Sequence, residues 1–262
     1  MSVPATLHRI PRWPHLWMVW LLLSQLLVAA LWWRLGWAWG LPLMVLSHAV
    51  FMVPVFLPRA RLYAPVLARL PDVGRAVWLT IDDGPSEDTP AMLDLLDRHG
   101  ARATFFLVGE RAQARPDLVG EILRRGHGIG NHTQTHPQAK FWRLGPFAMA
   151  SEIGEAQRAL ERIAGRAPVW FRSVVGMTNP FVAASLRRHG LTRVAWTARG
   201  FDAVDADPVR VLQRIQRGLR PGAIVLLHEG APHGRSLDIV DATLCLLAER
   251  GLATVLPETT PG

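Results

Sequence analysis

The sequence has 262 residues, half of them apolar, and carries a formal net charge of +8. The charge is unevenly distributed, because six of the 29 basic residues and none of the 21 acidic ones precede Asp72. From Asp72 onward the two signs nearly balance, and no basic stripe interleaved with aromatic residues occurs, which argues against a nucleic-acid partner. The excess positive charge lies beside apolar segments, where it favours anionic lipid headgroups.

Two apolar segments separated by Arg34 dominate the N-terminal part. A basic tail, residues 1–15, precedes the first segment, residues 16–33, which carries no charge and has tryptophans at both ends. Its length approaches the thickness of a bilayer core, and interfacial tryptophans are typical of spanning helices. The second segment, residues 37–57, contains prolines, which spanning helices tolerate. We therefore predict a transmembrane hairpin over residues 16–57; a cleaved signal peptide and a re-entrant second arm are the alternatives.

Basic residues around the hairpin predict its orientation. Two arginines precede it, one lies between its arms and three follow it: Arg9, Arg12, Arg34, Arg59, Arg61 and Arg69. The positive-inside rule then places both ends, and the large domain that follows, in the cytoplasm. The prediction is a multi-pass protein of the cell (inner) membrane. If the second arm does not span, the domain lies on the opposite side.

The rest of the chain alternates short apolar runs with helical patterns. We expect a basic linker over residues 58–71 and an α/β domain over residues 72–262. The predicted strands are residues 76–81, 103–108, 169–172, 193–197, 223–227 and 253–256, and the predicted helices are residues 89–99, 118–125, 152–163 and 237–250. Strands that alternate with helices of this length indicate a parallel α/β architecture.

Three polar clusters follow predicted strands or helices. Asp82 and Asp83 end the first strand, and two adjacent carboxylates there are costly to bury without a cation or hydrogen bonds. His132 and His136 are four residues apart, a spacing that puts both imidazoles on one face of a helical turn. With Asp83 they form an Asp-His-His set suited to a metal. His228 ends an apolar strand. Taken singly, each cluster is more often an ordinary turn, a chance pair or a core histidine.

The clusters form an ordered series of motifs. The series runs T-I-D-D-G-P, G-H-G-I-G-N-H-T-Q-T-H, F-R, W-T-A-R-G-F-D and L-L-H, over roughly residues 76–257. It resembles the polysaccharide deacetylase family, carbohydrate esterase family 4, with its NodB homology domain. Five motifs in the right order are far more specific than any one of them. The resemblance implies a distorted (β/α) barrel of the NodB homology type, here preceded by the transmembrane hairpin.

The resemblance also implies a metal site. It assigns zinc, or Co²⁺, Ni²⁺ or Mn²⁺, to Asp83, His132 and His136. A backbone N–H near Val174 or Val175 would then help to stabilise the oxyanion of the acyl group.

Four further residues match the family's catalytic positions. Asp82 would be the general base, and Arg172 the arginine that holds this base in place. His228 would be the general acid that protonates the leaving amine, and Asp202 the carboxylate that tunes it. Amide hydrolysis needs both a base and a separate acid, because the amine is a poor leaving group.

Two departures from the family pattern concern the substrate groove. Ser173-Val174-Val175 follows Arg172 where the family usually has a proline and an aromatic residue, and Ala203 replaces a frequent tryptophan. Fewer aromatic platforms disfavour a long glycan, and the predicted anchor favours a lipid-linked sugar, such as a polyprenyl-phosphate glycan or a glycolipid. The function predicted is removal of an N-acyl group, acetyl or formyl, from a membrane-proximal sugar. The alternatives are an extracytoplasmic peptidoglycan or polysaccharide deacetylase, and an inactive glycan-binding module.

Other polar residues receive structural interpretations. Glu152 and Glu155 are expected on a solvated helix face, and His127 beside a helix C-terminus. His233 is expected in a solvated loop. The single cysteine, Cys245, excludes an internal disulfide and a cysteine-based zinc site, and we expect it to be buried.

Overall fold

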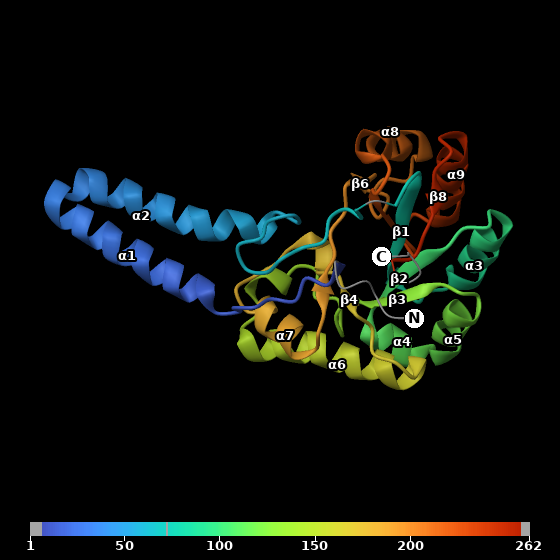
Figure 1. The fold of residues 1–262 in the computed structure, drawn as a ribbon, viewed down its shortest axis with the longest axis horizontal. Coiled ribbons are helices and arrows are strands. Elements are labelled where there is room, and N and C mark those ends of the chain that lie inside the picture. The colour runs from blue at the N-terminus through green and yellow to red at the C-terminus, as the bar shows by residue number, and fades with distance from the viewer. Residues whose placement is uncertain (1–6, 72, 258–262) are drawn as a thin grey trace.

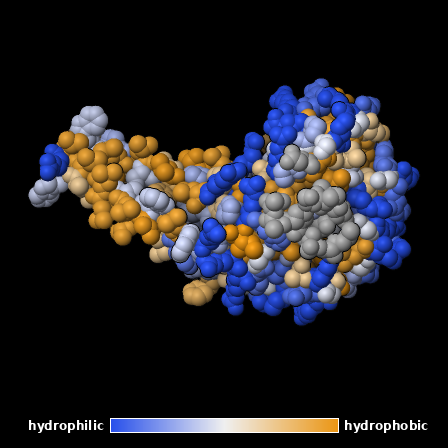
Figure 2. Space-filling model, in the orientation of Figure 1, coloured by the Kyte–Doolittle hydropathy of each residue, from blue (hydrophilic) through white to orange (hydrophobic). Residues whose placement is uncertain are grey.

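The computed structural model describes residues 7–71 and 73–257 and shows a helical hairpin that projects from an α/β domain (Figure 1). The hairpin consists of α1 (Leu16–Leu35) and α2 (Trp37–Met52), followed by the 3-10 helix η2 (Val53–Phe56). Both arms, Leu16–Leu35 and Trp37–Phe56, are long and apolar enough to cross a membrane by length and composition. Figure 2 shows their apolar surface as a continuous arm outside the domain.

The hairpin is held together by one close approach and one polar cluster. A Cβ on Gly40 would lie 2.2 Å from the Trp32 ring, so glycine lets the two helices touch. Gln25 Nε2 donates to Ser47 Oγ at 2.8 Å, and Ser47 Oγ donates to Ser24 Oγ at 3.1 Å. Polar groups paired in this way satisfy one another where no water is available.

The domain is a curled parallel sheet covered by helices, as predicted. Its strands are β1 (Ala76–Gly84), β2 (Ala103–Leu107), β3 (Gly128–Asn131), β4 (Trp170–Phe171), β5 (Thr192–Arg193), β6 (Ala198–Arg199), β7 (Ile224–His228) and β8 (Ala253–Thr254). They follow the order β5-β4-β3-β2-β1-β7-β6, with β8 also beside β1. The helices are α3 (Thr89–Arg98), α4 (Gly109–Ala114), α5 (Pro116–Arg124), α6 (Pro146–Ala164), α7 (Val182–Arg188), α8 (Pro208–Gly218) and α9 (Ser236–Glu249).

The two faces of β1 have different roles. Alternate residues such as Leu79 and Ile81 join the apolar core between the sheet and its helices. Trp78 points to the inner face, where it packs edge-on against Trp170 with ring centroids 5.0 Å apart. Thr80 and Asp82 continue that inner face and are also buried. The interior is therefore filled by aromatic rings at one end and becomes polar at the carboxyl ends of the strands.

The segments that flank the hairpin belong to the folded domain, which corrects the predicted tail and linker. The Leu67 N–H donates to Arg193 O, and the Ala195 N–H donates to Leu67 O, both at 2.8 Å. Leu67 also pairs with Val194 and Arg69 with Ala223, so residues 67–69 connect the end of β5 to the start of β7. On the N-terminal side, the Arg9 N–H donates to Thr192 Oγ1 at 2.9 Å. The folded unit thus begins upstream of the boundary predicted at residue 72.

Several elements were missed or shortened by the sequence analysis. The elements α4, β3, α7 and α8 were not predicted, and the strand expected at residues 193–197 overlaps β5 only at Arg193 and ends before β6 begins. Glycine-rich β3 has low strand propensity, yet glycine is required, since a Cβ on Gly130 would lie 2.6 Å from the Phe106 ring. Cys245 is exposed on α9, contrary to our prediction, because the buried face of that helix includes Thr243 and Leu247.

His127 was expected beside a helix C-terminus, but it is buried, and its Nδ1 accepts a hydrogen bond from the Ala103 N–H at 3.3 Å. Burial, assisted by the Arg102 cation, lowers the pKa of His127 to about 4. The unfolded chain takes up this proton near the ordinary pKa of about 6.5. The stability contributed by neutral His127 is therefore complete above that pH and is lost as the pH falls towards 4.

We expect acidification from pH about 7.5 to about 4.5 to reduce the free energy of unfolding by about 2.5 kcal/mol through His127 alone. His127→Asn keeps an acceptor for the Ala103 N–H but does not titrate. Denaturant unfolding of the full-length chain in detergent at both pH values should show a smaller acid loss in this variant. Equal losses in the two proteins would contradict the prediction.

Candidate active site

The predicted functional residues converge at the carboxyl ends of the parallel strands. Parallel strands present these ends at one edge, where catalytic groups of (β/α) barrels gather. The seven side chains come from the ends of β1, β3, β4, β6 and β7: Asp82, Asp83, His132, His136, Arg172, Asp202 and His228. All seven lie in two close groups and an attached ion pair, and the β1–β7 register places His228 next to Asp82.

Asp83, His132 and His136 form the first group. Asp83 Oδ1 lies 3.3 Å from His132 Nε2 and 3.0 Å from His136 Nε2, and their potential ligand atoms all lie within 4.8 Å of one another. His132 Nδ1 donates to the Arg172 carbonyl at 2.8 Å, so Nε2 is the ring nitrogen that faces Asp83. Asp83 Oδ1 is buried and makes no hydrogen bond of good geometry with any described residue. Converging lone pairs of two nitrogens and one oxygen suit a divalent cation such as zinc.

A bulge at the end of β1 allows both aspartates to face the site. Neighbouring residues of a regular strand point to opposite faces. The β1–β2 register shifts between Asp82 and Gly84, and Asp83 has a φ of 71°. This irregularity turns Asp83 towards the histidines while Asp82 stays on the inner face. Burial raises the pKa of Asp83, but His132 and His136 outweigh it and hold that pKa well below its usual range.

The two histidines are brought together by a loop after β3, and the predicted helical turn is wrong. Thr133 and His136 have φ values of 72° and 54°, outside the helical region. Glu152 shapes this loop: its Oε2 accepts from the Gln134 N–H at 3.0 Å and from the Thr135 N–H at 2.9 Å. The expectation that Glu152 is merely solvated is therefore wrong. Its signal in the sequence was weak, because the carboxylate lies on α6, far along the chain from the loop.

Arg172 and Asp82 form a buried ion pair next to the histidines. Arg172 Nη1 donates to Asp82 Oδ1 at 2.6 Å and to Thr80 Oγ1 at 2.8 Å. The guanidinium has no solvent exposure and lies 4.1 Å from the centroid of the Phe106 ring. Asp82 Oδ2 lies 3.7 Å from His132 Nε2, on the side of the first group. One oxygen of Asp82 is thus fixed by Arg172 and the other faces the histidines.

His228 and Asp202 form the second group. Asp202 Oδ2 accepts from the His228 N–H at 2.6 Å, and both carboxylate oxygens lie 3.1 Å from His228 Nδ1. Burial opposes protonation of the ring, but Asp202 outweighs it and raises the pKa of His228 to about 9. His228 is then cationic at neutral pH and can donate a proton. His233 Nε2 lies 2.6 Å from the Asp202 carbonyl oxygen, so this histidine supports the group rather than lying in a solvated loop.

Comparison with known proteins identifies the family of the chain. The family model of polysaccharide deacetylases matches residues 70–194. A chitooligosaccharide deacetylase from Bradyrhizobium is 35% identical over 185 residues, which cover 70% of this chain and 84% of that protein. The chain belongs to the polysaccharide deacetylase family.

Two solved structures of the family show the same fold. The family 4 carbohydrate esterase from Streptomyces lividans, in complex with acetate, is 33% identical with a TM-score of 0.64 and covers 71% of this chain and 95% of its own. A pseudoenzyme of the same esterase family from Bacillus anthracis is 26% identical with the same TM-score of 0.64, and covers 72% and 67%. The family therefore includes chains whose fold carries no activity, so individual residues decide the chemistry.

Three residues without a predicted role also lie near the site of this polysaccharide deacetylase: Glu229, Phe201 and Arg199. Buried Glu229 follows His228 and accepts from Ser86 Oγ at 2.8 Å; burial raises its pKa to about 7. Phe201 is 46% exposed next to Asp202, and the Arg199 guanidinium lies 4.3 Å from its ring centroid. Phe201 thus presents an aromatic face near the position where Ala203 replaces tryptophan. Arg199 and Phe201 lie within the W-T-A-R-G-F-D motif and Glu229 directly follows L-L-H, but no role was predicted for any of them, because their contacts arise from the fold.

We predict that Glu152→Gln weakens binding of the metal by about 10- to 100-fold, the usual effect of losing a partner that orients the ligands. The substitution replaces the carboxylate that accepts hydrogen bonds from the loop after β3 with a neutral, weaker acceptor, while helix α6 is retained. Titration of the metal-free, full-length protein with Zn²⁺ by calorimetry measures the effect.

Glu155→Gln on the same helix is the matched control, because Glu155 is exposed and its carboxylate accepts only from Ser151 among the described contacts. Equal zinc affinities for Glu152→Gln and wild type would contradict the proposed role of Glu152.

Proposed function

We propose that this chain removes an N-acyl group, acetyl or formyl, from a sugar carried on a membrane lipid. The observation that carries the proposal is that an arginine–aspartate pair and a histidine–aspartate pair lie near the cluster of Asp83, His132 and His136. Asp82, held by its arginine, and His228, held by its carboxylate, are neighbours in the β1–β7 register. A base and an acid next to one cation site suit the hydrolysis of an amide.

In this proposal the two groups divide the proton transfers. A divalent metal, most simply zinc, held by Asp83, His132 and His136 would acidify water and polarise the acyl carbonyl. Asp82 accepts the proton of the attacking water through the oxygen that Arg172 leaves free. As the carbon–nitrogen bond breaks, His228 donates its proton to the nitrogen, so the sugar leaves as an amine and the acyl group as an acid. Asp202 keeps the His228 ring oriented and cationic.

The position of the hairpin supports a membrane-bound substrate. The segment after Arg172 packs directly on the base of the hairpin, where the Thr178 N–H donates to Val55 O at 2.8 Å. The loop after the histidines reaches the same base, because Trp142 packs against Phe56 with ring centroids 5.7 Å apart. The segment after Arg172 and the loop after the histidines, both next to the site, therefore contact the end of the second apolar arm. A sugar anchored in the bilayer can reach such a site without leaving the membrane surface.

A second candidate is the deacetylation of soluble or cell-wall glycan by a domain that faces outward. The name of the Bradyrhizobium relative and the exposed ring of Phe201 favour it. Val174, Val175 and Ala203 oppose it, because they replace groove residues of the family and reduce the aromatic surface available to a long glycan.

We expect purified full-length protein to release acetate or formate from acylated polyprenyl-phosphate sugars faster than from chitooligosaccharides, and to stop when a chelator is added. Asp82→Asn should lower kcat by roughly 10²- to 10⁴-fold, because the base is lost while the fold is kept. Acid release is followed by coupled assay or mass spectrometry.

Asp117→Asn is the control for the charge change, since Asp117 lies exposed on α5. Faster turnover of the soluble oligomers would exclude the lipid-linked substrate in favour of the second candidate. Bound zinc without release of either acid from any substrate would favour an inactive glycan-binding module.

We further propose that both arms of the hairpin span the inner membrane and leave the catalytic domain in the cytoplasm. The arginines that flank the hairpin, with one alone at its tip, support this orientation. Protease added to intact spheroplasts should leave the domain undigested until the membrane is permeabilised. Digestion from outside would reverse the orientation.

A further inference from the structure

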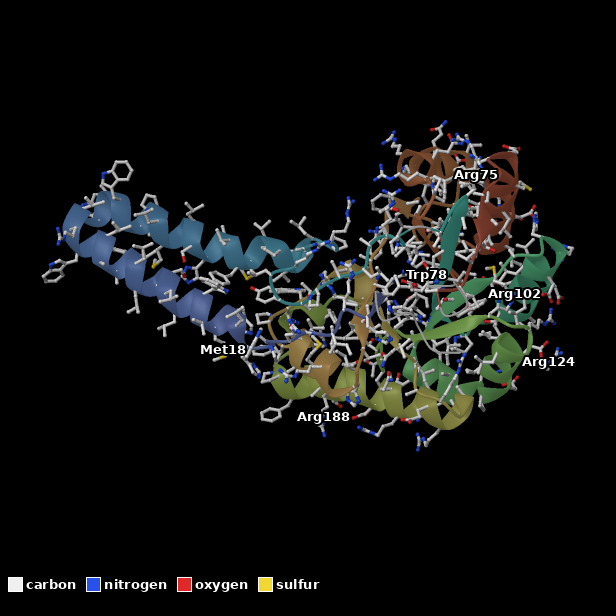
Figure 3. The ribbon with its side chains drawn as sticks, viewed as in Figure 1. Met18, Arg75, Trp78, Arg102, Arg124 and Arg188 are labelled. Carbon is white, nitrogen blue, oxygen red and sulfur yellow. The ribbon has the colours of Figure 1, made fainter. Side chains whose placement is uncertain are left out.

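A groove of about 720 Å³ lies between the start of α1 and helix α7, on the side of the domain from which the hairpin projects. We name it the juxtamembrane groove and define it by six of its lining residues: Trp13, Leu16, Val19, Ala184, Arg187 and Arg188. It is separate from the cluster of catalytic side chains, none of which lines it. Figure 3 shows Met18 and Arg188 on this side, away from Arg102 and Arg124 at the other end of the domain.

The arginines face the groove because of the way α7 packs. Val182, Ala183 and Leu186 are buried in the apolar cluster beneath the helix. Helical geometry then turns Arg187 and Arg188 outward. Arg187 Nη1 donates to the Arg12 carbonyl, which ties the chain just before α1 to α7. The two guanidiniums are thereby held next to the point where the chain enters the hairpin.

The groove is basic and lacks countercharge. Neither its lining nor that of the adjoining hollow around Arg12 and His8 includes an acidic residue in the described chain. The guanidinium and indole groups of the lining only donate hydrogen bonds, and a neutral imidazole adds one donor and one acceptor nitrogen. A neutral sugar would leave the paired guanidinium charges without a counterion. A phosphate ester matches both the charge and the donor geometry of paired arginines.

The position of the groove selects a lipid as the source of that phosphate. Leu16 and Val19 form its floor and begin the exposed apolar surface of α1, on which they are 44% and 51% exposed. Trp13, 75% exposed, stands at the same level, where amphipathic rings meet lipid headgroups. The two arginine side chains therefore lie next to the exposed apolar surface of α1. A phosphodiester with acyl chains requires this arrangement of charge and apolar surface.

We propose that the juxtamembrane groove binds the headgroup of one anionic phospholipid, with its phosphate on Arg187 and Arg188 and its acyl chains along Leu16 and Val19. The inference rests on the proposed insertion of the hairpin in a bilayer. Helix α7, which carries both arginines, packs with Phe141 and Val174 in one apolar cluster. A lipid bound to α7 therefore stabilises a segment that borders the catalytic site.

The test compares three ligands on full-length protein in non-ionic detergent. Short-chain phosphatidylglycerol, short-chain phosphatidylcholine and inorganic phosphate are titrated while tryptophan fluorescence and calorimetry report binding. We expect phosphatidylglycerol to bind at least about tenfold more tightly than phosphatidylcholine, since each basic group near an anionic headgroup contributes favourably. We expect inorganic phosphate to bind no more tightly than phosphatidylcholine.

Two variants of the groove should abolish this preference. Arg187→Gln with Arg188→Gln removes the charges, and Ala184→Trp fills the groove while both charges stay. The control is Arg217→Gln with Arg220→Gln, which makes the same charge change at and after the end of α8, on exposed residues away from the hairpin, and should keep the preference. Equal affinity of the wild type for both lipids, or a preference that survives in both groove variants, would overturn the proposal.

The outcome is independent of catalysis. Asp82→Asn protein should keep the lipid preference, whether or not the wild type proves to be a deacylase. Flotation with vesicles of phosphatidylcholine alone reports hairpin insertion, so a failure of membrane attachment is distinguished from a failure of the groove. Tight binding of inorganic phosphate would identify a site for free anions and overturn the assignment to lipid.

Discussion

The buried contacts of Arg172 connect Asp82 to the group of Asp83, His132 and His136. Its guanidinium holds Asp82 and Thr80, its carbonyl oxygen fixes the His132 ring, and its N–H donates to the Asn131 carbonyl at 3.0 Å. A guanidinium without solvent exposure loses its hydration, and only a close partner carboxylate compensates. Removing one member of such a pair is typically costly, by about 3–5 kcal/mol, because the other charge is left buried alone. The position of Asp82 and the tautomer of His132 therefore depend on the side chain and the peptide group of one residue, Arg172.

This interaction depends in turn on the division of the barrel interior. Trp78 and Trp170 fill the end that lies towards the amino ends of the strands and exclude water there. Above them the inner face of β1 becomes polar, and Arg172 lies between the Phe106 ring and Asp82. The aromatic side chains contact the guanidinium on the side of the strands' amino ends. The hydrogen bonds of the guanidinium therefore point towards the carboxyl ends of the strands. Close packing at one end of the interior thus orients the charged groups at the other.

The hairpin is integrated with the catalytic domain. Chain segments on both of its sides pair with β5, through Arg9 on one side and Leu67 on the other. Its second arm also contacts the loop after Arg172 through Val55. An anchor on a flexible linker would leave the orientation of the domain free, whereas these contacts set the site at a defined position relative to the apolar arms. The geometry accords with the proposed substrate, a sugar held at a membrane surface.

Much of the architecture was predictable from local patterns. The apolar arms, the α/β alternation and the motifs around Asp82, His132 and His228 depend on residues that are close in sequence, so periodicity and spacing reveal them. The tertiary structure decided how these parts meet. It replaced the expected helical turn at His132 and His136 with a loop clamped by Glu152. It also turned adjacent aspartates to one side through a bulge. Local sequence reports backbone preference and burial pattern, but the partners of a buried charge lie at distant positions, and only the closed fold brings them within hydrogen-bonding distance.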